Sequence, residues 1–207
     1  MRVLEANIRF FVEHGVKGVF EQGAYQSTGS EMAELRGWGL ARLLWDPTRD
    51  AQQTIDEFLD GYYGPAADEM RAYLAVTHGA VEASGDPLGC FSPAEAKFLS
   101  LATLSRGMEH LRAAEGTVVG DEALRQRVRV AQLPVLYAFI VRWDVLRKEA
   151  QDAGAAWPVP GTIQAAYERF MDIARPENVT MVSEGRKLDW LGSVVQQAAT
   201  RSAVPAP

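Results

Sequence analysis

The sequence predicts a mainly α-helical protein, in which a helical C-terminal domain follows one terminal β/α unit of an incomplete TIM-type barrel. Apolar residues recur with a period near 3.6 through most of the 207 residues, and cap residues, glycines and prolines divide them into segments. A short β-branched run, Val16–Phe20, is the one convincing strand. The predicted parts are the β/α unit at 1–47, the helical domain at 48–197 and a disordered tail at 198–207.

The first predicted element is a helix from Val3 to His14. Its apolar positions fall on one face, and Gly15 follows where a left-handed C-terminal cap is expected. These positions are Leu4, Ile8, Phe11 and Val12. Val16–Phe20 then favours a strand that is buried between two helices.

A polar loop, Glu21–Ser27, leads to the second predicted helix. Thr28 and Glu31 have the spacing of a reciprocal capping box at its start. The helix is expected to end near Trp45, because a residue before proline, here in Asp46-Pro47, is disfavoured in the helical region.

The next segments are also helical. Asp50 and Gln53 can cap a helix that runs through Leu59. Gly64-Pro65 ends this segment, and a further helix covers Asp68–Val76.

Two long antiparallel helices are predicted next. Ser92–Glu95 combines an N-cap serine, a proline and a glutamate, and opens a helix whose apolar positions include Phe98, Leu101, Met108 and Leu111. Gly116–Gly120 joins it to a helix that begins at Asp121 and carries an apolar stripe from Leu124 to Leu146. Pro134 is expected to kink or break this helix. After the joint at 157–161, a last helix covers 162–174.

Composition limits the possible partners. The chain has 21 Lys and Arg against 27 Asp and Glu, a net charge of -6, so a nucleic-acid partner is not expected. The most apolar uncharged stretch, Val130–Val141, is too short to cross a bilayer, so no membrane partner is expected. Glu5 interrupts any export signal at Met1, and the single Cys90 cannot form an internal disulfide.

One strand cannot form a sheet, because its backbone groups need neighbouring strands. We therefore interpret the first 45 residues as the end of a larger β/α structure. In this 207-residue chain the strand and its flanks would expose an apolar patch. We accordingly expect a homo-oligomer in which this region forms part of the contact.

Four motifs in order carry a family resemblance. They are Asn7–Phe11, Glu13–Gly23, Leu43–Pro47 and Ile55–Gly64. They resemble the C-terminal part of a family of glycoside-hydrolase-like proteins of unassigned activity, distantly similar to α-glucuronidases and β-hexosaminidases. The resemblance spans about residues 1–75. It implies a barrel that other parts of a parent protein supply, a carbohydrate partner bound through that parent, and export of the parent.

The predicted substrate-binding residues are Glu21, Gln22 and Tyr25, because the end of a barrel strand is where substrate-binding groups gather. The alternative is that Glu21 is a structural carboxylate and that the loop is merely polar. No catalytic residue can be assigned, since the barrel strands that carry the family's carboxylates have no counterpart here. The three histidines are widely separated, so neither a metal nor another cofactor is expected.

Other polar and aromatic residues favour structural roles. Trp38, Trp45 and Trp143 are expected in the core, and the arginines at 125, 127 and 129 on a solvated helix face.

Two functions remain open. The first is a C-terminal portion of a carbohydrate-active protein that is inactive alone. The second is a non-enzymatic helical interaction or dimerisation module, for which the stripe from Leu124 to Leu146 is the supporting feature.

Overall fold

Helices dominate the computed structural model, which describes residues 3–86 and 96–203. The elements are α1 (Leu4–Glu13), α2 (Ala33–Trp45), α3 (Ala51–Tyr63), η1 (Gly64–Ala66), α4 (Ala67–Ser84), η2 (Lys97–Leu99), α5 (Leu101–Thr117), α6 (Glu122–Val141), α7 (Trp143–Ala153), α8 (Ile163–Ala174), β1 (Met181–Ser183), β2 (Arg186–Lys187) and α9 (Leu188–Ala203). The prediction of a mainly α-helical fold is confirmed. None of the described helices is long and apolar enough to cross a membrane.

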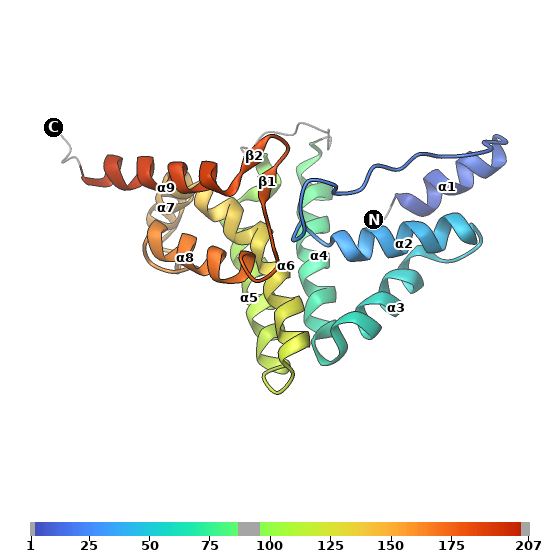
Figure 1. Ribbon diagram of the computed structural model, residues 1–207, viewed down its shortest axis with the longest axis horizontal. Coiled ribbons are helices and arrows are strands. Elements are labelled where there is room, and N and C mark those ends of the chain that lie inside the picture. The colour runs from blue at the N-terminus through green and yellow to red at the C-terminus, as the bar shows by residue number, and fades with distance from the viewer. Residues whose placement is uncertain (1–2, 87–95, 204–207) are drawn as a thin grey trace.

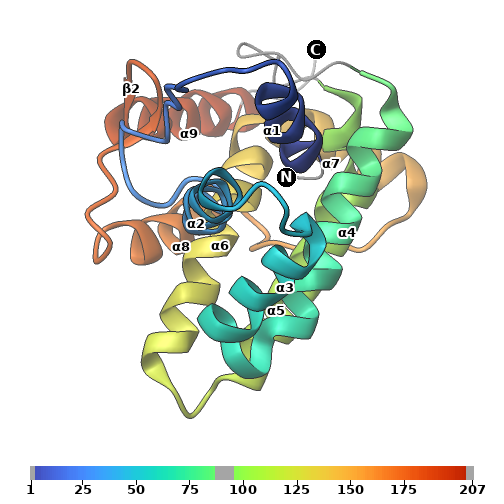
Figure 2. The same ribbon diagram turned by 90° about the vertical axis from the view of Figure 1, so that its right-hand side faces the viewer.

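The core is built around the neighbouring helices α4, α5 and α6 (Figures 1 and 2). The α5–α6 hairpin confirms the two predicted antiparallel helices, and α8 packs against α6. Fully buried side chains at the centre include Tyr73, Met108, Leu111, Phe139 and Leu146. Most side chains of the predicted apolar stripe of residues 124–146 are therefore buried in the chain's own core.

The N-terminal helix α1 has a separate small contact with the rest of the chain. Ile8, Leu43 and Ala51 form a second buried cluster between α1, α2 and the start of α3. The Glu5 carboxylate also accepts a hydrogen bond of 2.8 Å from the Ala51 backbone N–H. By contrast, Leu35 of α2 belongs to the main core.

The predicted cap at Asp50 is confirmed, and the helix starts predicted at Asp121 and Thr162 are also capped by these residues. The side chains of Asp50, Asp121 and Thr162 each accept a backbone hydrogen bond at the start of α3, α6 and α8. Gly15 has a positive φ of 68° after α1, which agrees with the predicted left-handed C-terminal cap.

The predicted strand at Val16–Phe20 is wrong for this chain. The segment is exposed and belongs to no sheet, and the strands of the described residues are β1 and β2, a short antiparallel pair. A β-branched sequence favours extended backbone, but a ladder also requires a partner strand. The terminal barrel unit is accordingly not confirmed.

The predicted capping box at Thr28 and Glu31 is also wrong. The Thr28 hydroxyl donates to the Glu177 carbonyl at 2.7 Å, and the Glu31 carboxylate accepts from the Tyr73 hydroxyl at 3.3 Å. Helix α2 begins later, after Met32, which has a positive φ of 47°. Long-range contacts therefore replace the local cap.

Several predicted boundaries shift. The helix expected from Ser92 is interrupted before α5, which Ser100 caps; residues 92–95 lie outside the described part. The helix expected from Asp121 through Leu146 is divided at Arg142 into α6 and α7, although α6 continues through Pro134. Residues 198–203 extend α9 instead of forming a disordered tail; the remainder of that predicted tail lies outside the described residues.

Candidate functional site

The predicted substrate-binding residues lie on the exposed segment between α1 and α2. Glu21 and Gln22 are exposed, and the Tyr25 hydroxyl donates to the Glu184 carboxylate at 2.9 Å, next to the β1–β2 turn. This hydrogen bond raises the pKa of Tyr25. The three side chains share a segment, but none of them lines the cleft described next.

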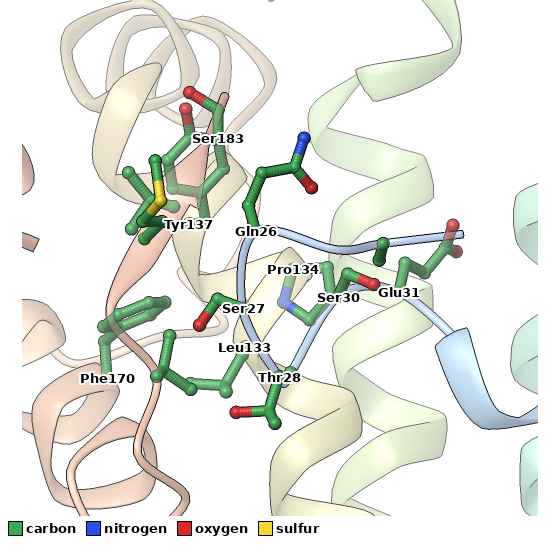
Figure 3. A pocket seen from close by; sticks show the side chains of 15 residues that line it. Gln26, Ser27, Thr28, Ser30, Glu31, Leu133, Pro134, Tyr137, Phe170 and Ser183 are labelled. Atoms are coloured by element: carbon green, nitrogen blue, oxygen red, sulfur yellow. The ribbon is translucent and has the colours of Figure 1, made fainter. Parts of the chain in front are cut away.

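A cleft of about 220 Å³ lies between the loop at residues 24–31 and the elements α6, α8 and β1 (Figure 3). Its apolar wall includes Leu133, Pro134 and Tyr137 of α6 and Phe170 of α8. The polar lining comes largely from the loop and β1, and includes Gln26, Ser27, Thr28, Ser30, Glu31 and Ser183. We call this space the loop cleft.

The loop is fastened to the C-terminal part of the chain. The Ser27 hydroxyl accepts from the Thr180 backbone N–H at 2.8 Å, and Thr28 donates to the Glu177 carbonyl. Gly29 has a φ of 79°, and a Cβ built there would lie 2.9 Å from Leu133 Cδ1. Glycine therefore permits both the backbone conformation and the close approach.

The polar groups of the loop cleft are partly engaged. The Ser30 hydroxyl accepts from the Arg36 guanidinium at 3.2 Å, and Glu31 accepts from Tyr73. Burial, together with the nearby Glu31 charge, raises the pKa of the Tyr73 hydroxyl, so Tyr73 stays a donor. An apolar wall with hydroxyls opposite suits a small ligand that has one apolar face and one hydroxylated face.

Sequence reasoning did not find the loop cleft. It placed residues 25–31 in a polar loop and a cap, but the partners of this loop lie about 150 residues away along the chain. A local pattern holds no signal for such contacts.

A polar cluster lies between α5, α6 and α8. The Glu115 carboxylate accepts from Arg129 at 2.6 Å, from Gln132 at 2.8 Å and from Arg169 at 3.2 Å. Burial opposes ionisation of Glu115, but the hydrogen bonds from Arg129 and Gln132 and the charge of Arg169 hold its pKa below the ordinary value. The Glu115 carboxylate is thus bonded to three side chains of the same chain, and the cluster fits a structural role.

The predicted solvated arginine face is wrong. Arg127 donates to the Tyr62 carbonyl at 2.7 Å and lies 4.5 Å above the Tyr62 ring, Arg129 binds Glu115, and Arg125 binds Glu122. These arginines connect neighbouring groups, and all three are partly buried.

The three tryptophans expected in the core differ in their burial. Trp143 is buried, as expected. Trp38 is partly buried and packs against the core, with its ring centroid 5.6 Å from that of Phe58. The prediction that Trp45 lies in the core is wrong, because this side chain is 92% exposed at the end of α2.

Exposed apolar side chains are concentrated near the N-terminus. Of the eleven large apolar side chains that are exposed in the described part of the chain, nine lie between Val3 and Trp45. They are Val3, Phe10, Val12, Val16, Val19, Phe20, Tyr25, Leu44 and Trp45. We call this set the N-terminal apolar surface.

The described residues contain no group of three His, Cys, Asp or Glu side chains that could hold a metal ion. The geometry thus defines a mainly α-helical protein with a small cleft and an exposed apolar N-terminal region. Residues 1–75 match the model of a family described as a domain of unknown function, DUF4838. Neither the curated proteins nor the solved structures contain a match to the chain.

Proposed function

We propose that this chain is the C-terminal portion of a glycoside-hydrolase-like, carbohydrate-active protein, and that it contributes binding contacts. The proposal is carried by the N-terminal apolar surface, because nine of the eleven exposed large apolar side chains in the described residues lie between Val3 and Trp45, and exposed apolar groups that gather in one part of a chain are expected where further structure docks. It is supported by the four motifs that follow one another in order within residues 1–75. The same residues match a family of unknown function.

Glu21 and Gln22 follow directly on Val16–Phe20, which belongs to the extended trace between α1 and α2 in Figure 1. If Val16–Phe20 completes a barrel, these two side chains lie at the rim where substrates bind in that fold. A carboxylate and an amide can hydrogen-bond sugar hydroxyls, and the exposed ring of Tyr25 can pack on a sugar face. The role of the chain is then to complete a carbohydrate site.

Catalysis by the isolated chain is not expected. Glycoside hydrolysis requires two carboxyl groups about 5 to 10 Å apart, one as acid and one as base or nucleophile. Glu21 is one candidate, and no second carboxylate is assigned to act with it.

The test combines binding and turnover on the full chain. In an NMR titration with a panel of neutral and acidic mono- and oligosaccharides, we expect shifts in the amides of residues 21–26, weakened by Glu21→Gln. The exposed carboxylate Glu13 gives the matched control, Glu13→Gln, which leaves the shifts unchanged. No hydrolysis of aryl glycosides is expected. Absence of shifts with every sugar, or turnover that Glu21→Gln abolishes, contradicts the proposal.

The second candidate function is a non-enzymatic α-helical interaction or dimerisation module. The observation in its favour is again the position of the exposed apolar side chains, since the stripe at 124–146 is largely buried. A chain that binds no sugar but still associates through its N-terminal region fits this function.

A further inference from the structure

The segment Val16–Gln22 has the features of an open β-strand. All its residues are exposed, and the exposed fraction reaches 45% at Val16, 41% at Val19 and 89% at Phe20. Figure 1 shows it as part of a long extended trace from the end of α1 toward the loop before α2. Within the described part of the chain, no backbone hydrogen bond is formed by residues 17–22. Unpaired backbone of this kind is a template for strand addition.

We propose that two copies of this chain associate by antiparallel pairing of Val16–Gln22 about a two-fold axis at Val19. This register sets Val19 opposite Val19, Gly18 opposite Phe20, and Lys17 opposite Glu21 of the second copy. Because the contact is two-fold symmetric, each unlike pair forms twice, and the two copies contribute the same surface to the interface.

Charge selects this register. Antiparallel pairing about Val19 creates two Lys17–Glu21 pairs, one on each side of the central valines, and opposite charges in directly opposed positions are favourable. A parallel arrangement in the same register sets Lys17 against Lys17 and Glu21 against Glu21. A slip by one or two residues separates Lys17 from Glu21. The sequence of the segment is therefore self-complementary in one arrangement.

Side-chain size supports the same register. Successive residues of a strand point to opposite faces, so Lys17, Val19 and Glu21 share one face. On the other face Phe20 lies opposite Gly18, where an aromatic ring covers the backbone that a glycine leaves open. The side chain with the highest exposed fraction in the segment, Phe20, thus gains a contact that the single chain does not give it.

The apolar side chains of the segment supply part of the dimer contact. Val16, Val19 and Phe20 are 45%, 41% and 89% exposed. A standard interface buries about 800 Å² per partner, so the backbone and polar atoms of the segment and exposed side chains beside it have to supply the larger share.

A charge-reversal series tests the proposal. Sedimentation velocity of the full chain at tens of micromolar is expected to give a dimer, with twice the monomer mass of 22.7 kDa. Lys17→Glu and Glu21→Lys each set like charges opposite each other at both ends and weaken the dimer about tenfold. The double variant restores it, and an equimolar mixture of the two single variants forms a heterodimer.

Lys187→Glu, at an exposed lysine on β2, is the control with the same change in charge as Lys17→Glu, and it leaves the dimer intact. A wild-type monomer at 100 µM overturns the proposal. A double variant as weak as the single variants overturns the register.

A cross-linking pair tests the register without altering charge. In a Cys90→Ser background, Val19→Cys places two thiols opposite each other at the axis and forms an intermolecular disulfide on mild oxidation. Val16→Cys, at a valine of similar exposure, is the matched control, since its two copies lie roughly 20 Å apart. Equal cross-linking of both variants, or none with Val19→Cys, contradicts the pairing. The inference concerns the 207-residue chain and does not rest on sugar binding.

Discussion

Replacing Gly29 by alanine tests how the loop cleft is held together. Gly29 combines a positive φ of 79° with close contacts, because a Cβ there would lie 2.9 Å from Leu133 Cδ1 and 3.1 Å from Val179 Cγ2. Left-handed backbone costs an L-residue about 1–2 kcal/mol. Both contact side chains are buried, at 2% and 7% exposure, so they have little space to move. Overpacking adds about 1–3 kcal/mol.

We therefore expect Gly29→Ala to lower the free energy of unfolding by roughly 3 kcal/mol. Urea denaturation followed by circular dichroism measures this free energy. All variants are compared at one protein concentration, because self-association makes the unfolding midpoint depend on concentration. Two other glycines separate the cost of the backbone conformation from the cost of overpacking. Gly154 has a φ of 59° and nothing within 4 Å, so Gly154→Ala reports the backbone term of about 1–2 kcal/mol.

Gly23 has neither a positive φ nor a close neighbour, so Gly23→Ala is expected to change stability by less than about 0.5 kcal/mol. The reasoning is refuted if Gly29→Ala costs no more than Gly154→Ala, since the close packing of the loop on α6 would then contribute nothing.

Three further substitutions test individual side-chain interactions. Arg127→Met removes the hydrogen bond to the Tyr62 carbonyl and the ring contact, and should cost about 1–3 kcal/mol in urea denaturation; a cost equal to that of the exposed-site control Arg106→Met would argue against the contact. Asp50→Ala removes the α3 cap and should cost about 1 kcal/mol, whereas an unchanged midpoint would show that the cap is not formed in solution. Because the pKa of Glu115 is lowered in the folded chain, its stabilisation is present above the ordinary value of about 4.3 and is lost as the pH falls through the folded pKa. Glu115→Gln should therefore flatten the loss of stability between pH 7 and pH 3, and an identical pH profile of the two proteins would contradict this assignment.

The features that sequence predicts well are local. The cap at Asp50 and the helix starts at Asp121 and Thr162 could be predicted, because each depends on a hydrogen bond that spans three residues and so on residue type and spacing. The same reasoning fails at Thr28, whose hydroxyl could cap α2 but binds the Glu177 carbonyl, 149 residues away.

The loop cleft could not be predicted for the same reason. Its walls come from residues 24–31, α6, α8 and β1, which tertiary packing alone brings together. The extended path of residues 16–20 in Figure 1 agrees with their β-branched composition, but the lack of a partner strand in the described part of the chain could not be predicted, since pairing depends on what lies beside the segment. Trp45 illustrates the remaining difficulty: an apolar helix indicates burial, yet the end of α2 projects this side chain into solvent.

The central claim is that the extended N-terminal segment is a contact surface. Hydrogen exchange followed by mass spectrometry on a peptide that covers residues 16–22 tests it most directly, at low and at high protein concentration. We predict fast exchange at low concentration, protection of these amides at high concentration, and no such protection in Lys17→Glu. Fast exchange of the segment at every concentration, with α5 and α6 fully protected, would contradict the claim.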